Sequence, residues 1–102
     1  MSLPVVFRPA VGRDLARAYW WYEERHRGLG EQFLAAVDAT FGQIEQFPEI
    51  FAVRYGRVRM AVVSRFPYAV FYCVDPQRVV ILTVLHTSDD PKNWPQSRGK
   101  AR

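Results

Sequence analysis

The spacing of apolar residues changes once along the chain, close to Gly56, and this change limits the possible folds more than any other feature. Upstream of it, apolar residues recur every three or four positions, which is the spacing of one face of an α-helix. Downstream they alternate with other residues or run continuously, as they do in β-strands. A chain of 102 residues has room for one domain. We therefore expect one α+β domain, with helices from the first half packed on a sheet built mainly from the second.

The first helix is expected to run from Arg13 to Arg27. Gly12 can cap it, and Asp14 then falls in its first turn, where the helix dipole favours a negative charge. Its apolar face has the spacing i, i+3, i+4 and i+7 and comprises Leu15, Ala18, Tyr19 and Tyr22. Both tyrosines of this face are expected to pack in the core. Trp20 lies off the face, so we expect its indole to be exposed for a partner.

The second helix is expected after a tight connection at Gly28-Leu29-Gly30. Glycine adopts the left-handed conformation that ends many helices. The helix should run from about Glu31 to Phe47, and Pro48 ends it because proline has no backbone N–H to donate. Its apolar positions are Phe33, Leu34, Val37, Phe41 and Ile44. So short a connection predicts an antiparallel helix hairpin.

Strand composition is found at both ends of the chain. A loop from Phe51 to Gly56 precedes the C-terminal strands, and the first of these is expected to carry Arg59 and Arg65 on one face. The expected strands are Val5 to Phe7, a stretch that begins at Val58, Tyr68 to Val74 and the apolar run Val79 to Leu85. The predicted fold is thus an N-terminal strand and an antiparallel helix hairpin packed on a mainly antiparallel sheet. Residues 1–95 should form the domain and residues 96–102 a basic, disordered tail.

Positive charge is concentrated in the second half of the chain. Residues 1–53 hold five arginines against seven acidic residues, whereas residues 54–102 hold nine basic residues against three acidic ones. No acidic residue occurs between Glu49 and Asp75. The arginines of that interval are Arg54, Arg57, Arg59 and Arg65. Such a cluster suits phosphate, nucleic acid or an acidic protein surface; the alternative is an ordinary solvated face.

Metal and disulfide chemistry are not expected. Cys73 is the single cysteine, which excludes an internal disulfide, and with only two histidines a zinc site is not indicated. Cys73 lies within an expected strand and should be a small core residue. We expect no cofactor. The apolar run from Leu3 to Phe7 is too short for a signal peptide or a membrane span, so we expect a cytoplasmic protein.

Several short motifs occur in a characteristic order along the chain. They are Asp14-Leu15, Trp21-Tyr22-Glu23, Gly28-Leu29-Gly30, Phe33-Leu34, Phe47-Pro48, Arg65-Phe66-Pro67-Tyr68, Phe71-Tyr72 and Val84-Leu85-His86. In this order, from Val5 to Trp94, the chain resembles the ParE/RelE superfamily of toxins from bacterial type II toxin-antitoxin systems. The resemblance implies a toxin neutralised by a cognate antitoxin, which wraps the toxin and alone contacts operator DNA. The wide aromatic stripe of Tyr19, Trp20 and Trp21 is compatible with such an antitoxin-binding surface.

The resemblance leaves two kinds of target, because the superfamily contains ribosome-dependent messenger-RNA endonucleases and ParE-like poisons of DNA gyrase. RNA cleavage through the 2′-hydroxyl needs a base, cations for the charged phosphorane and an acid for the leaving oxygen. Arg59 and Arg65 fit the cationic role, and His86 fits the acid or base role because histidine titrates near neutrality. These three residues are the catalytic candidates if the chain is a nuclease. The alternative for His86 is a buried hydrogen bond at a strand end.

The remainder of the nuclease pattern is missing. The residues that stand where relatives commonly carry one or two arginines are Thr87, Ser88, Asp89 and Asp90, and acidic groups there would repel an RNA phosphate. Trp94 stands where the nucleases tend to end in a Tyr or His, and indole cannot transfer a proton. We therefore expect a ParE-like inhibitor that is not an enzyme, with the nuclease and a non-toxic binding module as the open alternatives. The residues expected to contact the target are Arg54, Arg57, Arg59, Arg65, Tyr72, His86 and Trp94.

Overall fold

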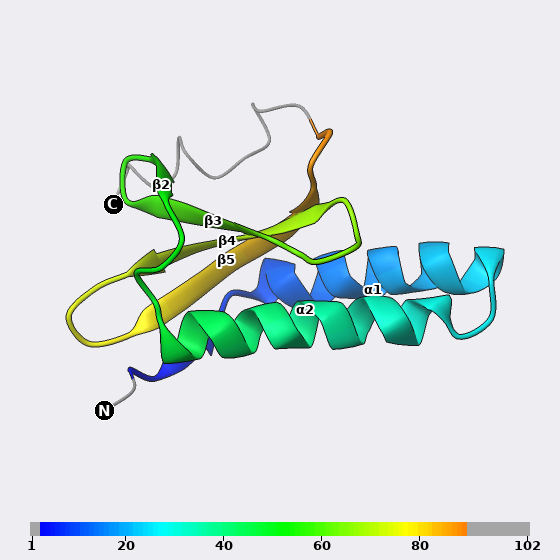
Figure 1. Cartoon of the computed structure of the whole chain (residues 1–102), viewed down its shortest axis with the longest axis horizontal. Helices are drawn as coiled ribbons and strands as arrows, with labels where there is room; N and C mark the ends of the chain where they lie inside the picture. The colour runs from blue at the N-terminus through cyan, green and yellow to red at the C-terminus, as the bar shows by residue number, and fades with distance from the viewer. Residues whose placement is uncertain (1–2, 90–102) are drawn as a thin grey trace.

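Two helices lie side by side on one face of a five-stranded sheet in the computed structural model, which describes residues 3–89 (Figure 1). The elements in chain order are β1 (Val5–Phe7), α1 (Pro9–Arg25), α2 (Leu29–Gln46), β2 (Val53–Tyr55), β3 (Val58–Val62), β4 (Tyr68–Val74) and β5 (Val79–His86). The strand order is β1-β5-β4-β3-β2. β1 pairs with β5 in parallel, and the other three pairs are antiparallel. The predicted α+β fold is confirmed, and β5 and β4 are its central strands.

The start of α1 differs from the prediction. The helix begins at Pro9, whose fixed φ suits the first helical position, and the preceding residue Arg8 is its N-cap. Gly12 therefore lies inside the helix, and the predictions that it caps α1 and that Asp14 belongs to the first turn are wrong. α2 likewise begins two residues before the predicted start, at Leu29, and ends at Gln46. The helix hairpin itself is as predicted (Figure 1).

Two corrections concern the strands. The segment predicted as a loop contains β2, which is antiparallel to β3 and only three residues long. β3 ends at Val62, so Arg65 is not on that strand and the prediction that it shares a strand face with Arg59 is wrong. The chain turns there: Arg65 has a φ of 71°, and the Val63 N–H donates to the carbonyl of Tyr68 at 2.8 Å.

The connection between the helices explains two of the motifs that carry the family resemblance. The carboxylate of Glu23 accepts the backbone N–H groups of Gly28 and Gly30, both at 2.9 Å, and so caps the N-terminus of α2. Gly28 has a φ of 88°, which favours glycine. A Cβ on Gly30 would lie 2.8 Å from the carbonyl oxygen of Tyr19, so glycine permits the close approach of the two helices.

The main core lies between the helices and the sheet. The core residues from the two helices recur with the predicted helical spacing. Four aromatic rings fill the end of the core near the connection between the helices. The rings of Tyr22, Phe33, Phe66 and Tyr68 lie with centroids 5.0 to 6.1 Å apart. A second apolar cluster of Val58, Ala69 and Phe71 is buried on the opposite face of the sheet. Burial of both faces explains why β4 and β5 are apolar almost throughout.

A buried carboxylate joins α1 to β5. Phe71 pairs with Thr83 and Tyr72 pairs with Ile81, so Leu82 is an extra residue that forms a β-bulge in β5. Just past the bulge, the Val84 N–H donates to Oδ2 of Asp14 at 2.9 Å, and the Thr83 hydroxyl donates to the same oxygen. Asp14 is buried, and these donors compensate for its lost hydration. Asp14 is therefore a structural residue that positions α1 on the sheet.

Candidate target- and partner-binding surfaces

Arg59 and Tyr72 face the helix side of the sheet and hold the loop that follows α2. The two residues pair across β3 and β4. The Arg59 guanidinium donates to the carbonyl oxygens of Phe51, at 2.7 Å, and Glu49, at 3.3 Å. The Tyr72 hydroxyl donates to the carbonyl of Pro48 at 2.8 Å. These contacts give both side chains a structural role.

Tyr72 has no exposed surface, so its ring is not available to a target in this structure. Burial raises the pKa of its hydroxyl to about 12, although the nearby Arg59 charge opposes the shift. The hydroxyl therefore stays protonated at physiological pH, which is the form that donates to Pro48.

Arg65 and His86 lie toward the other end of the sheet. His86 pairs with Tyr68 and Arg59 pairs with Tyr72, four residues further along β4. At roughly 3.3 Å per residue the two pairs are about 13 Å apart. The three catalytic candidates therefore do not form one group: Arg65 and His86 lie toward one end of the sheet, and Arg59 lies far from His86.

The imidazole of His86 is engaged in a local turn. Its Nδ1 accepts the Ser88 N–H at 3.0 Å and lies 2.7 Å from the Ser88 hydroxyl. Because Nδ1 accepts an N–H, the neutral ring carries its proton on Nε2. The ring also packs edge-on against Tyr68, with centroids 5.2 Å apart. His86 is half-buried.

The exposed arginines fall into two groups. Arg54 on β2 and Arg57 in the turn before β3 lie at one edge of the sheet, whereas Arg65 lies in the turn between β3 and β4. All three side chains are exposed, and within residues 3–89 none of them forms an ion pair. They remain available to an anionic surface. Trp94, the last of the expected target contacts, lies outside the described residues.

The aromatic residues at the end of α1 differ in exposure. Trp20 is 58% exposed and Trp21 49%, whereas Tyr19 is half-buried and donates to Glu31 at 3.1 Å. The Arg25 guanidinium lies 3.6 Å from the centre of a Trp21 ring and also donates to the Trp21 carbonyl at 2.9 Å. Trp21 thus has a cation–π partner on its own helix, and Trp20 is the more open of the two indoles.

Neither a membrane-spanning helix nor a metal-binding group is found in the described part of the chain. No helix there is both long and apolar enough to cross a bilayer. Among residues 3–89, no three His, Cys, Asp or Glu side chains come together in an arrangement that could hold a metal ion.

Comparison with known proteins gives both a family and a fold. Residues 5–91 match the family model described as the ParE toxin of the type II toxin-antitoxin system parDE. A solved structure described as the chromosomal ParDE TA system from P. aeruginosa superimposes with a TM-score of 0.74, at 15% sequence identity, over 82% of this chain and 95% of that one. None of the curated protein sequences gives a significant match. The family match covers most of the chain, and it shows that this chain belongs to the ParE toxin family of type II toxin-antitoxin systems.

Proposed function

We propose that this ParE-type toxin acts by binding DNA gyrase, without cutting RNA, and that a cognate antitoxin neutralises it. The observation that carries the proposal is the position of Arg59. Its guanidinium donates to two backbone carbonyls, and the strand pair that contains Arg59 lies about 13 Å along β4 from the pair that contains His86. A nuclease needs its cations and its acid or base around one phosphate. The family match supports ParE-type toxicity, and a non-hydrolytic mechanism fits the divided residues.

The target is expected to contact the exposed arginines. Arg54 and Arg57 project from the edge formed by β2 and the following turn, and Arg65 projects from the turn after β3. Exposed arginines of this kind steer and orient a partner whose surface is acidic. A complex of gyrase with DNA presents the DNA phosphates, which are anionic. We place this action in the cytoplasm.

The antitoxin is expected to cover Trp20 on α1. This indole is exposed, and the only aromatic contact seen for it within residues 3–89 is the edge of Tyr19, with centroids 4.9 Å apart. Tryptophan is enriched among the residues that dominate binding energy at interfaces. Covering it would also remove a large apolar surface from water.

A ribosome-dependent nuclease is the second candidate. The observation in its favour is that Arg65 and His86 both lie toward the same end of the sheet, where the turn after β3 meets the end of β5. A nuclease built on these two residues would work without Arg59. The messenger-RNA measurement below separates this candidate from the first.

Expression in a bacterial host tests the proposal. Induction of the chain alone should arrest growth, and co-expression of the small gene next to it should restore growth. During arrest, messenger RNA should remain intact, because the proposed target is gyrase. Cleavage of messenger RNA at ribosomal A sites would contradict the gyrase proposal and support the ribosome-dependent nuclease. Unimpaired growth at high soluble expression would contradict toxicity altogether.

Variants of α1 test the antitoxin surface. Trp20→Ala should remain toxic but bind the antitoxin about 30-fold more weakly, the scale of an interface hot spot of about 2 kcal/mol. Trp21→Ala is the matched control, since Arg25 already covers that ring, and it should weaken binding less. Equal affinities of Trp20→Ala and the unchanged chain would place the antitoxin elsewhere.

A further inference from the structure

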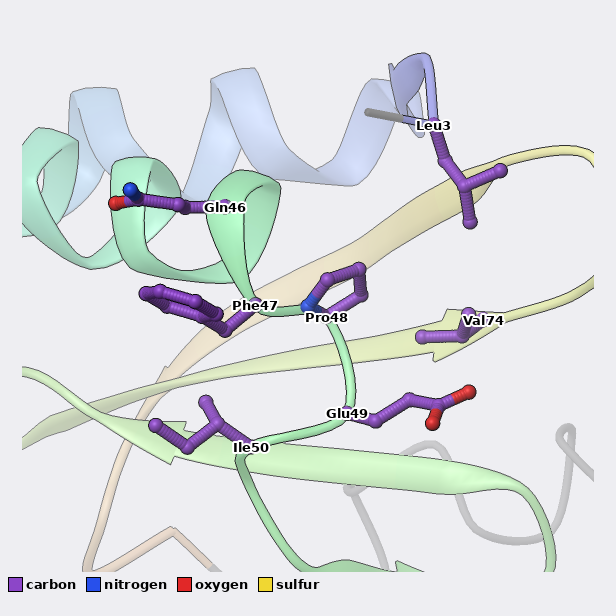
Figure 2. Close-up of a pocket in the computed structure, with 7 residues that line it drawn as sticks. All are labelled: Leu3, Gln46, Phe47, Pro48, Glu49, Ile50 and Val74. Atoms are coloured by element: carbon purple, nitrogen blue, oxygen red, sulfur yellow. The ribbon is translucent and has the colours of Figure 1, made fainter. Parts of the chain in front are cut away.

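An open apolar pocket lies where α2 ends, and none of the surfaces discussed above includes it. Its volume is about 390 Å³, within the range of about 300 to 1,000 Å³ in which proteins commonly bind ligands. Three separate segments line it: Leu3 ahead of β1, the segment from Gln46, the last residue of α2, to Ile50, and Val74 at the end of β4 (Figure 2). Each wall therefore comes from a different part of the fold.

The loop of this pocket exposes two large apolar side chains. Phe47 is 54% exposed and Ile50 is 64% exposed, the highest value among the large apolar residues of the described chain. Exposed apolar residues that occur singly are ordinary, but two of them beside one pocket form a patch that can mark a binding site. Figure 2 shows both side chains projecting from the same short loop.

Side chains of the sheet hold the same loop in place through hydrogen bonds. Its carbonyl groups accept hydrogen bonds from Tyr72, at Pro48, and from Arg59, at Glu49 and Phe51. The Ile50 N–H also donates to the Phe47 carbonyl at 3.1 Å. A partner that binds a loop already fixed in one conformation loses less conformational entropy than one that must order it. Phe47 and Ile50 are thus presented on a preorganised support.

Among the described residues that line the pocket, Glu49 carries the only charged side chain. The Glu49 side chain extends at its edge (Figure 2), and within residues 3–89 it forms no ion pair. The pocket also adjoins the C-terminus of α2, which is the negative end of the helix dipole, and the last turn of that helix holds no basic residue. The guanidinium of Arg59 is nearby, but its hydrogen bonds are to the backbone carbonyls of Glu49 and Phe51.

We propose that this pocket binds a protein segment that carries an apolar anchor side chain next to a lysine or arginine. The anchor would pack between Phe47, Ile50 and Val74, and the cation would lie against Glu49 and the end of α2. The open shape favours a segment of a protein over a small molecule, since small ligands usually have most of their surface buried. Neither Trp20 nor any of the exposed arginines is among the residues that line the pocket, so the proposal does not depend on the gyrase target.

Two synthetic nonapeptides test the proposal. Each carries one central tryptophan, flanked by lysines in the first peptide and by glutamates in the second, with a fluorescein label. Fluorescence anisotropy should show that the full chain binds the lysine peptide at least 10-fold more tightly than the glutamate peptide. In ¹H–¹⁵N spectra the lysine peptide should shift the amide signals of Phe47, Glu49, Ile50 and Val74. Failure of both peptides to bind at about 1 mM, or shifts confined to other residues, would overturn the proposal.

Substitutions separate the apolar and charged contributions. Ile50→Ser should weaken binding of the lysine peptide at least 10-fold, and Glu49→Lys should reverse the preference between the peptides. Val62→Ser is the matched control, because Val62 is 59% exposed but lies on β3 and is not among the residues that line the pocket, and it should bind as the unchanged chain does. If Ile50→Ser does not fold, Glu49→Lys alone decides the outcome. An unchanged peptide preference in Glu49→Lys would refute the proposal.

Discussion

The hydroxyl of Tyr72 donates a hydrogen bond to the carbonyl oxygen of Pro48 and so ties the middle of β4 to the loop after α2. Only the neutral hydroxyl can donate it. Burial raises the Tyr72 pKa from about 10 to about 12 in the folded chain. The folded state therefore favours the protonated form, and this contribution to stability is complete below pH 10 and lost as pH rises toward 12.

Urea unfolding at several pH values measures this effect. Tyr72→Phe keeps the ring and removes the titrating group. We expect the unchanged chain to exceed Tyr72→Phe in free energy of unfolding by about 1 kcal/mol near pH 8. The difference should shrink between about pH 10 and 12. A difference that stays constant across this range would mean that Tyr72 does not titrate as its burial requires.

Gly30 and Gly42 give a matched pair of glycine substitutions in α2. Gly30→Ala places a Cβ 2.8 Å from the Tyr19 carbonyl oxygen and should destabilise the chain by about 1 to 3 kcal/mol through overpacking. Gly42 has open space around it, so Gly42→Ala should stabilise the chain by up to about 1 kcal/mol. Melting temperatures should move in opposite directions. Equal shifts would argue against close packing of the helices.

Asp14 tests the link between α1 and the bulge of β5. Asp14→Ala leaves the buried Val84 N–H without an acceptor and should cost about 1 to 3 kcal/mol in free energy of unfolding. Asp38→Ala, at an exposed position of α2, should change it by less than about 0.5 kcal/mol. Denaturant midpoints compare the two variants. Similar small effects would contradict a structural role for the buried carboxylate.

Arg59 and Arg65 should differ in how they affect the chain. Arg59→Ala removes two hydrogen bonds to backbone carbonyls and should lower the melting temperature by several degrees. Arg65→Ala removes an exposed cation and should leave the melting temperature nearly unchanged while it reduces toxicity. Thermal unfolding and growth assays on both variants make the comparison. Equal melting temperatures of the two variants would mean that the hydrogen bonds of Arg59 do not stabilise the fold.

The element order and the α+β fold were predictable because apolar periodicity reports which faces are buried. Val5 to Phe7, the helix hairpin and the alternation on β4 follow from local patterns. The start of α1 was predicted too late because Gly12 was treated as its cap, whereas the helix begins at Pro9, a residue well suited to the first helical position.

The candidate site was less predictable because it depends on contacts between distant residues. Alternation placed Arg59 on a strand but could not show that its side chain lies on the helix side of the sheet, where the loop after α2 supplies carbonyl acceptors. Arg65 continued the same alternation in the sequence, but the chain leaves the sheet after Val62 and adopts a left-handed turn. The buried partners of Asp14 depend on a bulge in β5, and the local sequence gives no sign of it.

The most direct test of the proposed mechanism is a supercoiling assay with purified gyrase and relaxed plasmid DNA. We expect the purified chain to inhibit supercoiling or to trap gyrase–DNA complexes, and Arg65→Ala to be weaker. In parallel reactions with programmed ribosomes, messenger RNA should remain intact. Normal supercoiling at a molar excess of the chain, together with cleavage of the ribosome-bound messenger RNA, would contradict the account.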